Sequence, residues 1–179
     1  MIAYKFLAAG GIGRFTGFRW EAGTWVDAST ADPCRSGIHA CRVADLPIWL
    51  DKELWEIELD GEILVGERKV VATRARLTQR VDGWTPELAR EFGRFCSRRT
   101  RARVGFVPVL SGYVADVDRF VAQNRIAIAG FAAARAAELR DGPAAYERER
   151  GAQASWLADR LGLGRSGSSA EEKDGSREP

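Results

Sequence analysis

The stretch Leu54-Trp55-Glu56-Ile57-Glu58-Leu59 decides the fold of the N-terminal half, because it alternates apolar and acidic side chains. Successive side chains of a β-strand point to opposite faces, so Trp55, Ile57 and Leu59 would share one buried face. Asp60-Gly61 follows and predicts a turn, and residues 69–81 alternate again. We therefore expect two antiparallel strands at the centre of a sheet with one apolar face.

The rest of residues 1–82 also has the pattern of strands and turns. Residues 2–7 predict a short strand, and residues 16–20 and 24–28 predict a hairpin around Glu21-Ala22-Gly23. Residues 38–42 predict another strand. Residues 43–50 predict one or two helical turns, limited by a proline.

Residues 83–163 have the periodicity of helices. Thr85 can cap a helix with Pro86 at its first position, and apolar steps of three and four over 114–139 predict one long helix. Residues 144–161 predict a last helix that ends at a glycine. The order of elements favours an α+β fold, in which a mostly antiparallel N-terminal sheet packs against a C-terminal set of helices in one joint core. Residues 164–179 contain Ser, Gly and charges, and predict a disordered tail.

Composition narrows the class of protein. The chain of 179 residues is 45% hydrophobic and has a net charge of +2. It has no apolar stretch long enough for a membrane helix and no signal-peptide pattern. Its three cysteines are an odd number, which excludes a fully paired disulfide framework. We therefore expect a cytoplasmic protein that does not contact a membrane.

The segment Cys34-Arg35-Ser36-Gly37-Ile38-His39-Ala40-Cys41 contains the only histidine and two of the three cysteines. We expect it to form a small-ligand site made of Cys34, His39 and Cys41, with Trp20 and Trp25 of the predicted hairpin lining the cleft. His39 is also a candidate general base. With Cys96, the three residues have the composition of a tetrahedral zinc site. The alternative is a buried histidine beside cysteines that serve as small apolar side chains.

A second candidate surface is the arginine stripe at 90–103, which ends the first long helix. Of the 27 basic residues only four are lysine, and Arg98, Arg99, Arg101 and Arg103 are the densest group. Such a stripe can bind the phosphates of a nucleic acid. The alternative is a solvated helix end whose cations complement the helix dipole.

Four segments of residues 4–81 resemble a family of bacterial and phage domains of unknown activity. They are Gly17-Phe18-Arg19-Trp20, the motif Cys34-x2-Gly37-Ile38-His39-Ala40-Cys41, residues 55–61 and residues 69–72. The resemblance implies a shared sheet scaffold.

More remotely, the order of Gly37-Ile38-His39-Ala40, a short helix and a strand resembles the core of the ADP-ribosyltransferases. That resemblance implies NAD as a cofactor. Where the family has a histidine or arginine on its first strand this chain has Tyr4 and Lys5, and His39 stands at the position of the family's tyrosine. We thus expect a small-ligand-binding or regulatory domain whose partner is a small molecule or a protein. The alternatives are an NAD-using transferase and a nucleic-acid-binding protein.

Overall fold

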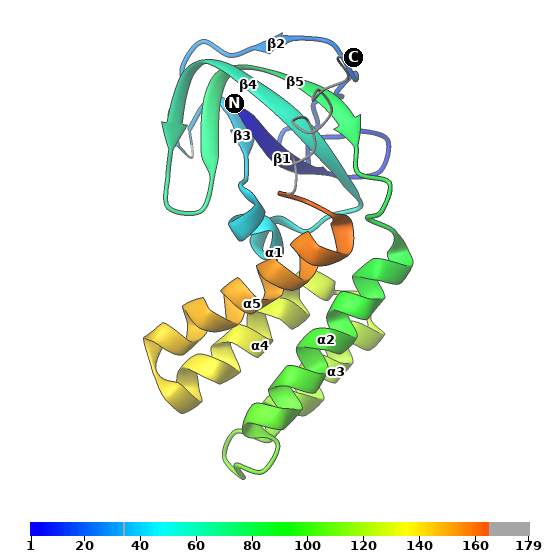
Figure 1. Cartoon of the computed structure of the whole chain (residues 1–179), viewed down its shortest axis with the longest axis vertical. Helices are drawn as coiled ribbons and strands as arrows, with labels where there is room; N and C mark the ends of the chain where they lie inside the picture. Colours follow the sequence, from blue (N-terminus) through cyan, green and yellow to red (C-terminus); the bar gives the residue numbers. More distant parts are fainter. Residues whose placement is uncertain (34, 165–179) are drawn as a thin grey trace, which may run out of the picture.

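The computed structural model describes residues 1–33 and 35–164, and these residues form an α+β fold (Figure 1). An antiparallel sheet lies at one end of the molecule, and four longer helices lie side by side at the other, which confirms the predicted fold class. Cys34 and residues 165–179 of the predicted 164–179 tail lie outside the described residues. The strands are β1 (Ile2–Leu7), β2 (Val26–Asp27), β3 (Ile38–Ala40), β4 (Glu53–Val65) and β5 (Val70–Arg80). The helices are the 3-10 turn η1 (Val43–Asp45), α1 (Leu46–Trp49), α2 (Pro86–Val104), α3 (Gly112–Ala122), α4 (Ile126–Asp141) and α5 (Pro143–Leu161).

The sheet closes on itself to form a small barrel. β4 pairs with β1 on one side and with β5 on the other, and β3 pairs with the free side of β5. The residue after β3, Cys41, then exchanges two backbone hydrogen bonds with Tyr4 of β1, at 2.8 and 2.7 Å. This pairing completes a ring β1-β4-β5-β3 and brings the His39 segment beside the first strand.

The β4–β5 hairpin is longer than its pattern predicts. The predicted turn at Asp60-Gly61 is wrong, because β4 continues to Val65 and the chain turns at 66–69. Gly61 has φ +72°, a left-handed conformation that suits glycine, and it lies in a break of the β4–β5 register. The Thr73 hydroxyl accepts the Glu62 N–H at 2.9 Å across this irregularity. A glycine inside a strand thus marks a bulge here, which sequence spacing alone does not distinguish from a turn.

The predicted hairpin over residues 16–28 is also wrong. Only Val26–Asp27 forms a strand, and it pairs with β5. Residues 8–19, which we call the glycine loop, instead fold back on themselves through bridges from Ile12 to Ala8 and to Arg19. Gly10, Gly11 and Gly17 all have positive φ, which allows these tight reversals.

Helical boundaries follow the capping residues. The Thr85 hydroxyl accepts the Leu88 N–H at 3.2 Å, as its N-cap position predicts. The predicted single helix over 114–139 is wrong, because Asn124 adopts φ 56° and separates α3 from α4. Asparagine tolerates the left-handed conformation better than most residues do, and the apolar repeat continues through the break. α4 ends at Gly142, and the predicted end of the last helix at a glycine, Gly162, is confirmed.

Buried side chains gather in two clusters. One fills the barrel and includes Leu7, Trp20, Ile57 and Leu77. The other lies among the helices and contains residues from both halves of the chain. Its members are Cys41, Leu46, Leu50, Leu54, Trp84, Phe92, Cys96, Val117, Ile126, Ala129, Ala132, Ala133 and Leu157. The outer side of the barrel and α1 therefore form one wall of the helical core.

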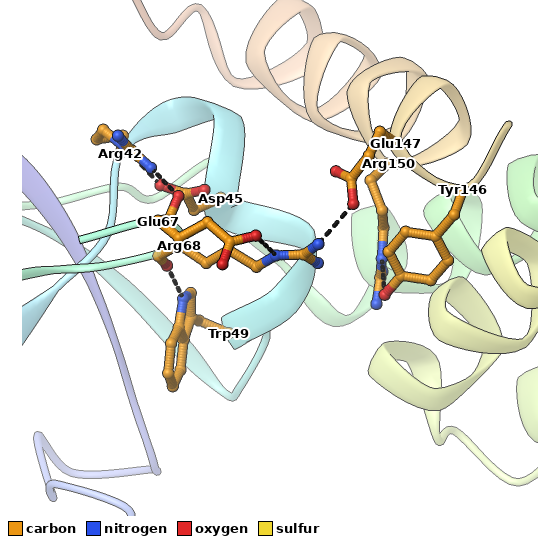
Figure 2. A network of polar contacts seen from close by, with 8 residues as sticks. All are labelled: Arg42, Asp45, Trp49, Glu67, Arg68, Tyr146, Glu147 and Arg150. Atoms are coloured by element: carbon orange, nitrogen blue, oxygen red, sulfur yellow. Dashed lines mark hydrogen bonds and ion pairs between the residues drawn. The ribbon is translucent and has the colours of Figure 1, made fainter. Parts of the chain in front are cut away.

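A polar network joins the β4–β5 turn to α5 (Figure 2). Arg68 lies at its centre, with its guanidinium 2.5 Å from the Glu147 carboxylate and 5.4 Å from the centre of the Tyr146 ring. The Arg68 carbonyl accepts the indole N–H of Trp49 at 2.9 Å. These contacts fix the barrel against the last helix beside the helical core, against which Trp49 also packs.

Among the described residues, we find no helix that combines the length and the apolar character required to cross a bilayer.

Candidate functional site

His39 lies on β3, where it pairs with Val71 of β5. Gly37 permits the close approach of β3 to β5, because its φ is +101° and a Cβ there would lie 2.6 Å from Val71 Cγ1. The His39 side chain is half-buried, and burial lowers its pKa, with the charges of Lys69 and Lys5 acting in the same direction. The imidazole is therefore neutral near pH 7 and is not a local positive charge.

The two described thiols are buried. Cys41 and Cys96 are both members of the helical core cluster. Burial raises the pKa of Cys41 to about 12 and also raises that of Cys96. Neither thiol is a ready nucleophile, since the thiolate is the reactive form. Cys34 lies outside the described residues, and residues 1–33 and 35–164 contain no group of three or more His, Cys, Asp or Glu side chains that could hold a metal ion.

Trp20 and Trp25, predicted to line a cleft, instead carry cations against their rings. Trp20 is buried in the barrel, where Lys5 Nζ lies 5.0 Å from the ring centre. Trp25 lies on the sheet surface, where the guanidinium carbons of Arg74 and Arg76 are each 4.7 Å from its ring centre. Both rings therefore take part in cation–π contacts within the fold.

Lys5 enters the sequence analysis only through the ADP-ribosyltransferase resemblance, and its burial was not predicted. It alternates with Ala3 and Leu7, which both point into the barrel, and its ammonium donates a hydrogen bond to the His39 carbonyl at 2.6 Å. Burial lowers the pKa of Lys5 to about 8. The signal was present in the strand pattern, because a lysine occupies the inward-facing register between two apolar residues.

The arginine stripe at the end of α2 divides into paired and unpaired members. Arg99 donates two hydrogen bonds of 2.8 Å to Glu149, a carboxylate that is only 2% exposed. Arg103 lies 3.7 Å from the same carboxylate, and Arg101 lies 2.7 Å from Asp118. These three arginines neutralise acids of the bundle. Arg98 alone among the four predicted residues has no hydrogen bond or ion pair to the described part of the chain.

Arg98 lines a depression between α2 and α5, which we call the α2–α5 groove. Its volume is about 270 Å³. The groove is lined by Glu91, Arg94 and Arg98 of α2 and by Trp156 and Arg160 of α5.

Trp156, which lines this groove, belongs to a cluster of three aromatic rings. The Trp156 ring lies 5.4 Å from the Phe95 ring at an interplanar angle of 24°, and Phe92 lies beneath both. The Arg160 guanidinium covers Trp156 at 5.2 Å from the ring centre and lies 3.4 Å from Glu91. The apolar rings fix the spacing of the two helices, so the charged side chains at the rim have a rigid base.

The electrostatics of the groove are unbalanced. Three guanidinium groups face one carboxylate, and that carboxylate is paired with Arg160. Arg94 and Arg98 are one helical turn apart, and neither is bonded to the described part of the chain. Like charges at this spacing destabilise a helix by about 0.2–0.5 kcal/mol. An anion bound between them would remove this repulsion.

A second hollow, of about 370 Å³, lies beside the polar network of Figure 2 and differs in charge. Its two arginines, Arg68 and Arg135, are each paired with a carboxylate of the same lining, at 2.5 and 2.6 Å. An incoming anion would have to compete with those acids. The α2–α5 groove is therefore the stronger candidate.

Sequence reasoning missed the contribution of α5 to the groove. Trp156 has the spacing of an apolar anchor and Arg160 that of a cation in a last helical turn. Their position beside Arg94 and Arg98 depends on how α5 packs against α2, and helix periodicity does not specify that packing.

Comparison with protein-family models, curated proteins and solved structures finds no significant match. The resemblances to the bacterial and phage domains and to the ADP-ribosyltransferase core thus stay predictions.

Proposed function

We propose that the protein is a binding domain that holds a single strand of nucleic acid in the α2–α5 groove. The observation that carries the proposal is the pair of unneutralised arginines, Arg94 and Arg98, in a groove that is also lined by Trp156. Proteins that bind single strands combine a basic groove that follows the phosphates with flat groups on which bases stack. The Arg160 guanidinium, whose carbon lies 5.2 Å from the centre of the Trp156 ring, provides such a group.

The size of the groove favours a segment of a strand over a complete small molecule. Pockets for drug-sized ligands have volumes of about 300–1,000 Å³ and enclose most of the ligand. The α2–α5 groove is smaller, at about 270 Å³, and mostly polar. It therefore suits one nucleotide of a longer chain whose neighbours remain in solvent. The proposal takes up the nucleic-acid-binding alternative of the sequence analysis, with arginines of α2 as the site in place of the His39 segment.

The test is fluorescence anisotropy with a labelled oligothymidylate of about 20 nucleotides, longer than typical single-strand site sizes. We expect binding that weakens steeply between about 50 and 200 mM salt. Arg94→Ala/Arg98→Ala should weaken binding at low salt by about 10-fold or more, because each charged hydrogen bond contributes about 1.5–3 kcal/mol. The slope of log affinity against log salt should become shallower by about 1.4, the contribution of two phosphate contacts.

The matched control is Arg90→Ala/Arg101→Ala. It removes the same charge from the same helix, but Arg90 and Arg101 are paired with Glu87 and Asp118 and do not line the groove. Its salt slope should stay close to that of the wild type. Absence of wild-type binding would overturn the proposed function, and an equal loss in both double variants would overturn the groove as its site.

A further inference from the structure

The glycine loop exposes two aromatic rings on a closely bonded scaffold. Phe15 is 84% exposed and Phe18 is 45% exposed. The backbone around them is held by hydrogen bonds from Gly13 N–H to the Phe18 carbonyl and from Gly17 N–H to the Gly13 carbonyl, both of 2.8 Å. A Cβ at Gly13 would lie 2.7 Å from the Thr16 hydroxyl, so the turn is tight. The two rings are therefore presented to solvent by an ordered turn.

The barrel fixes the base of this loop. The Glu53 carboxylate accepts the Gly10 N–H at 2.8 Å and the indole N–H of Trp55 at 3.0 Å. Trp20 follows the loop, and its backbone N–H donates a hydrogen bond to the Gly11 carbonyl at 2.9 Å. Phe18 packs edge-on against the Trp20 ring at 5.4 Å between ring centres. The loop thus has a defined orientation on the barrel.

The loop has only positive charges. Residues 8–19 contain Arg14 and Arg19 and no acidic residue. Arg14 lies 5.9 Å from the Phe15 ring centre, and Arg19 has no hydrogen bond or ion pair to the described part of the chain. Two arginines beside two flat rings form a surface that suits a polyanion with stacking groups.

The loop adjoins the end of the molecule where α2 begins and α5 ends. Arg14 Nε lies 3.9 Å from the Asp51 carboxylate, and the Asp51 carbonyl accepts the indole N–H of Trp84 at 2.8 Å. Trp84 directly precedes α2. Its neighbour Gly83 abuts Leu161 of α5, because a Cβ there would lie 3.2 Å from Leu161 Cδ2. A strand leaving the α2–α5 groove at this end would meet the glycine loop.

We propose that Phe15 and Phe18 stack on bases of the nucleic-acid strand held in the α2–α5 groove, and that Arg14 and Arg19 bind its phosphates. This inference rests on the proposed function and adds the residues that recognise bases. An anionic lipid surface is the competing partner for exposed rings beside arginines. The flat shape of both exposed apolar side chains and the position of the loop beside the groove helices favour the strand.

The experiment compares two labelled strands of equal length, oligothymidylate and a strand without bases, on the full chain. Base–aromatic stacking is lost on truncation of the ring, so Phe15→Ala should weaken binding of oligothymidylate by about 5-fold or more. Phe18→Leu, which keeps apolar volume against Trp20, should have a similar effect. Both variants should bind the baseless strand as the wild type does, with unchanged salt slopes. Thermal unfolding by circular dichroism checks that the variants are folded.

Phe106→Ala is the matched control, because Phe106 is 69% exposed in the α2–α3 turn and also contacts an arginine, Arg140. It should leave both affinities unchanged. The inference is overturned if Phe15→Ala binds oligothymidylate like the wild type, or weakens both strands equally. It is also overturned if Phe15→Ala instead abolishes binding to phosphatidylserine vesicles. If Arg94→Ala/Arg98→Ala loses binding while Phe15→Ala binds normally, the role of the glycine loop is refuted and the role of the α2–α5 groove is supported.

Discussion

Replacing Lys5 by methionine should change how stability depends on pH. The Lys5 ammonium is enclosed by the barrel, near the Trp20 ring and the His39 carbonyl. Burial lowers its pKa from 10.5 to about 8. Between these two values the unfolded chain holds a proton that the folded chain has released, so the free energy of unfolding rises with pH across this window. Methionine does not titrate, so its contribution to the free energy of unfolding does not change with pH.

The size of the effect follows from the two pKa values. A shift from 10.5 to about 8 corresponds to about 3.4 kcal/mol over the whole window. Between pH 7 and pH 9 the wild type should therefore gain about 1.3 kcal/mol relative to Lys5→Met. The hydrogen bond to His39 does not account for this gain, because a neutral amine also donates it.

Urea unfolding of both proteins at several pH values between 7 and 10 measures this difference directly. Cys41 and Tyr4 have raised pKa values and titrate in both proteins, so subtraction of the two curves removes most of their effect. If the difference in free energy of unfolding between the two proteins does not change with pH, the lowered pKa of Lys5 is refuted. A difference that falls as pH rises would show that the folded barrel prefers the charged form.

Two further substitutions test the helical half. Glu149→Ala should destabilise the fold by about 3–5 kcal/mol in urea unfolding, because it leaves the charges of Arg99 and Arg103 without their buried partner. The control is Glu147→Ala, which removes an exposed carboxylate and should change the free energy of unfolding by less than about 1 kcal/mol. Asn124→Ala should lower the free energy of unfolding by about 1–2 kcal/mol since φ is 56° there, whereas Asn124→Gly should stay close to the wild type, and equal stabilities would contradict the strained turn between α3 and α4.

The strand patterns predicted the sheet, but not its closure. The alternation in residues 54–59 and 69–81 correctly identified β4 and β5, because period-two burial is a local property. The backbone hydrogen bonds between Tyr4 and Cys41 join residues that are far apart in sequence, and neither residue has a local pattern that indicates its partner. The break between α3 and α4 at Asn124 was not predicted for a related reason, since one residue with positive φ leaves the apolar repeat unchanged.

The candidate site was predicted only in part. The arginine stripe was visible in the sequence, yet pairing with acids from other helices distinguishes Arg98 from Arg99, Arg101 and Arg103. Sequence records the number of guanidinium groups but not the distance of each from Glu149 or Asp118. The interest in His39 rested on its rarity in the chain, and rarity does not determine exposure or charge.

Closure of the barrel has a consequence for biosynthesis. Every strand of the ring lies before residue 81, so a nascent chain can complete it before α2 leaves the ribosome. The apolar outer wall formed by Leu46, Leu50 and Leu54 must then wait to be covered by later residues of the same cluster, which extend to Ile126 of α4 and Leu157 of α5. During that interval the emerging polypeptide has a closed barrel with an exposed apolar surface. Chaperones that bind such surfaces would meet this protein while it is still being translated.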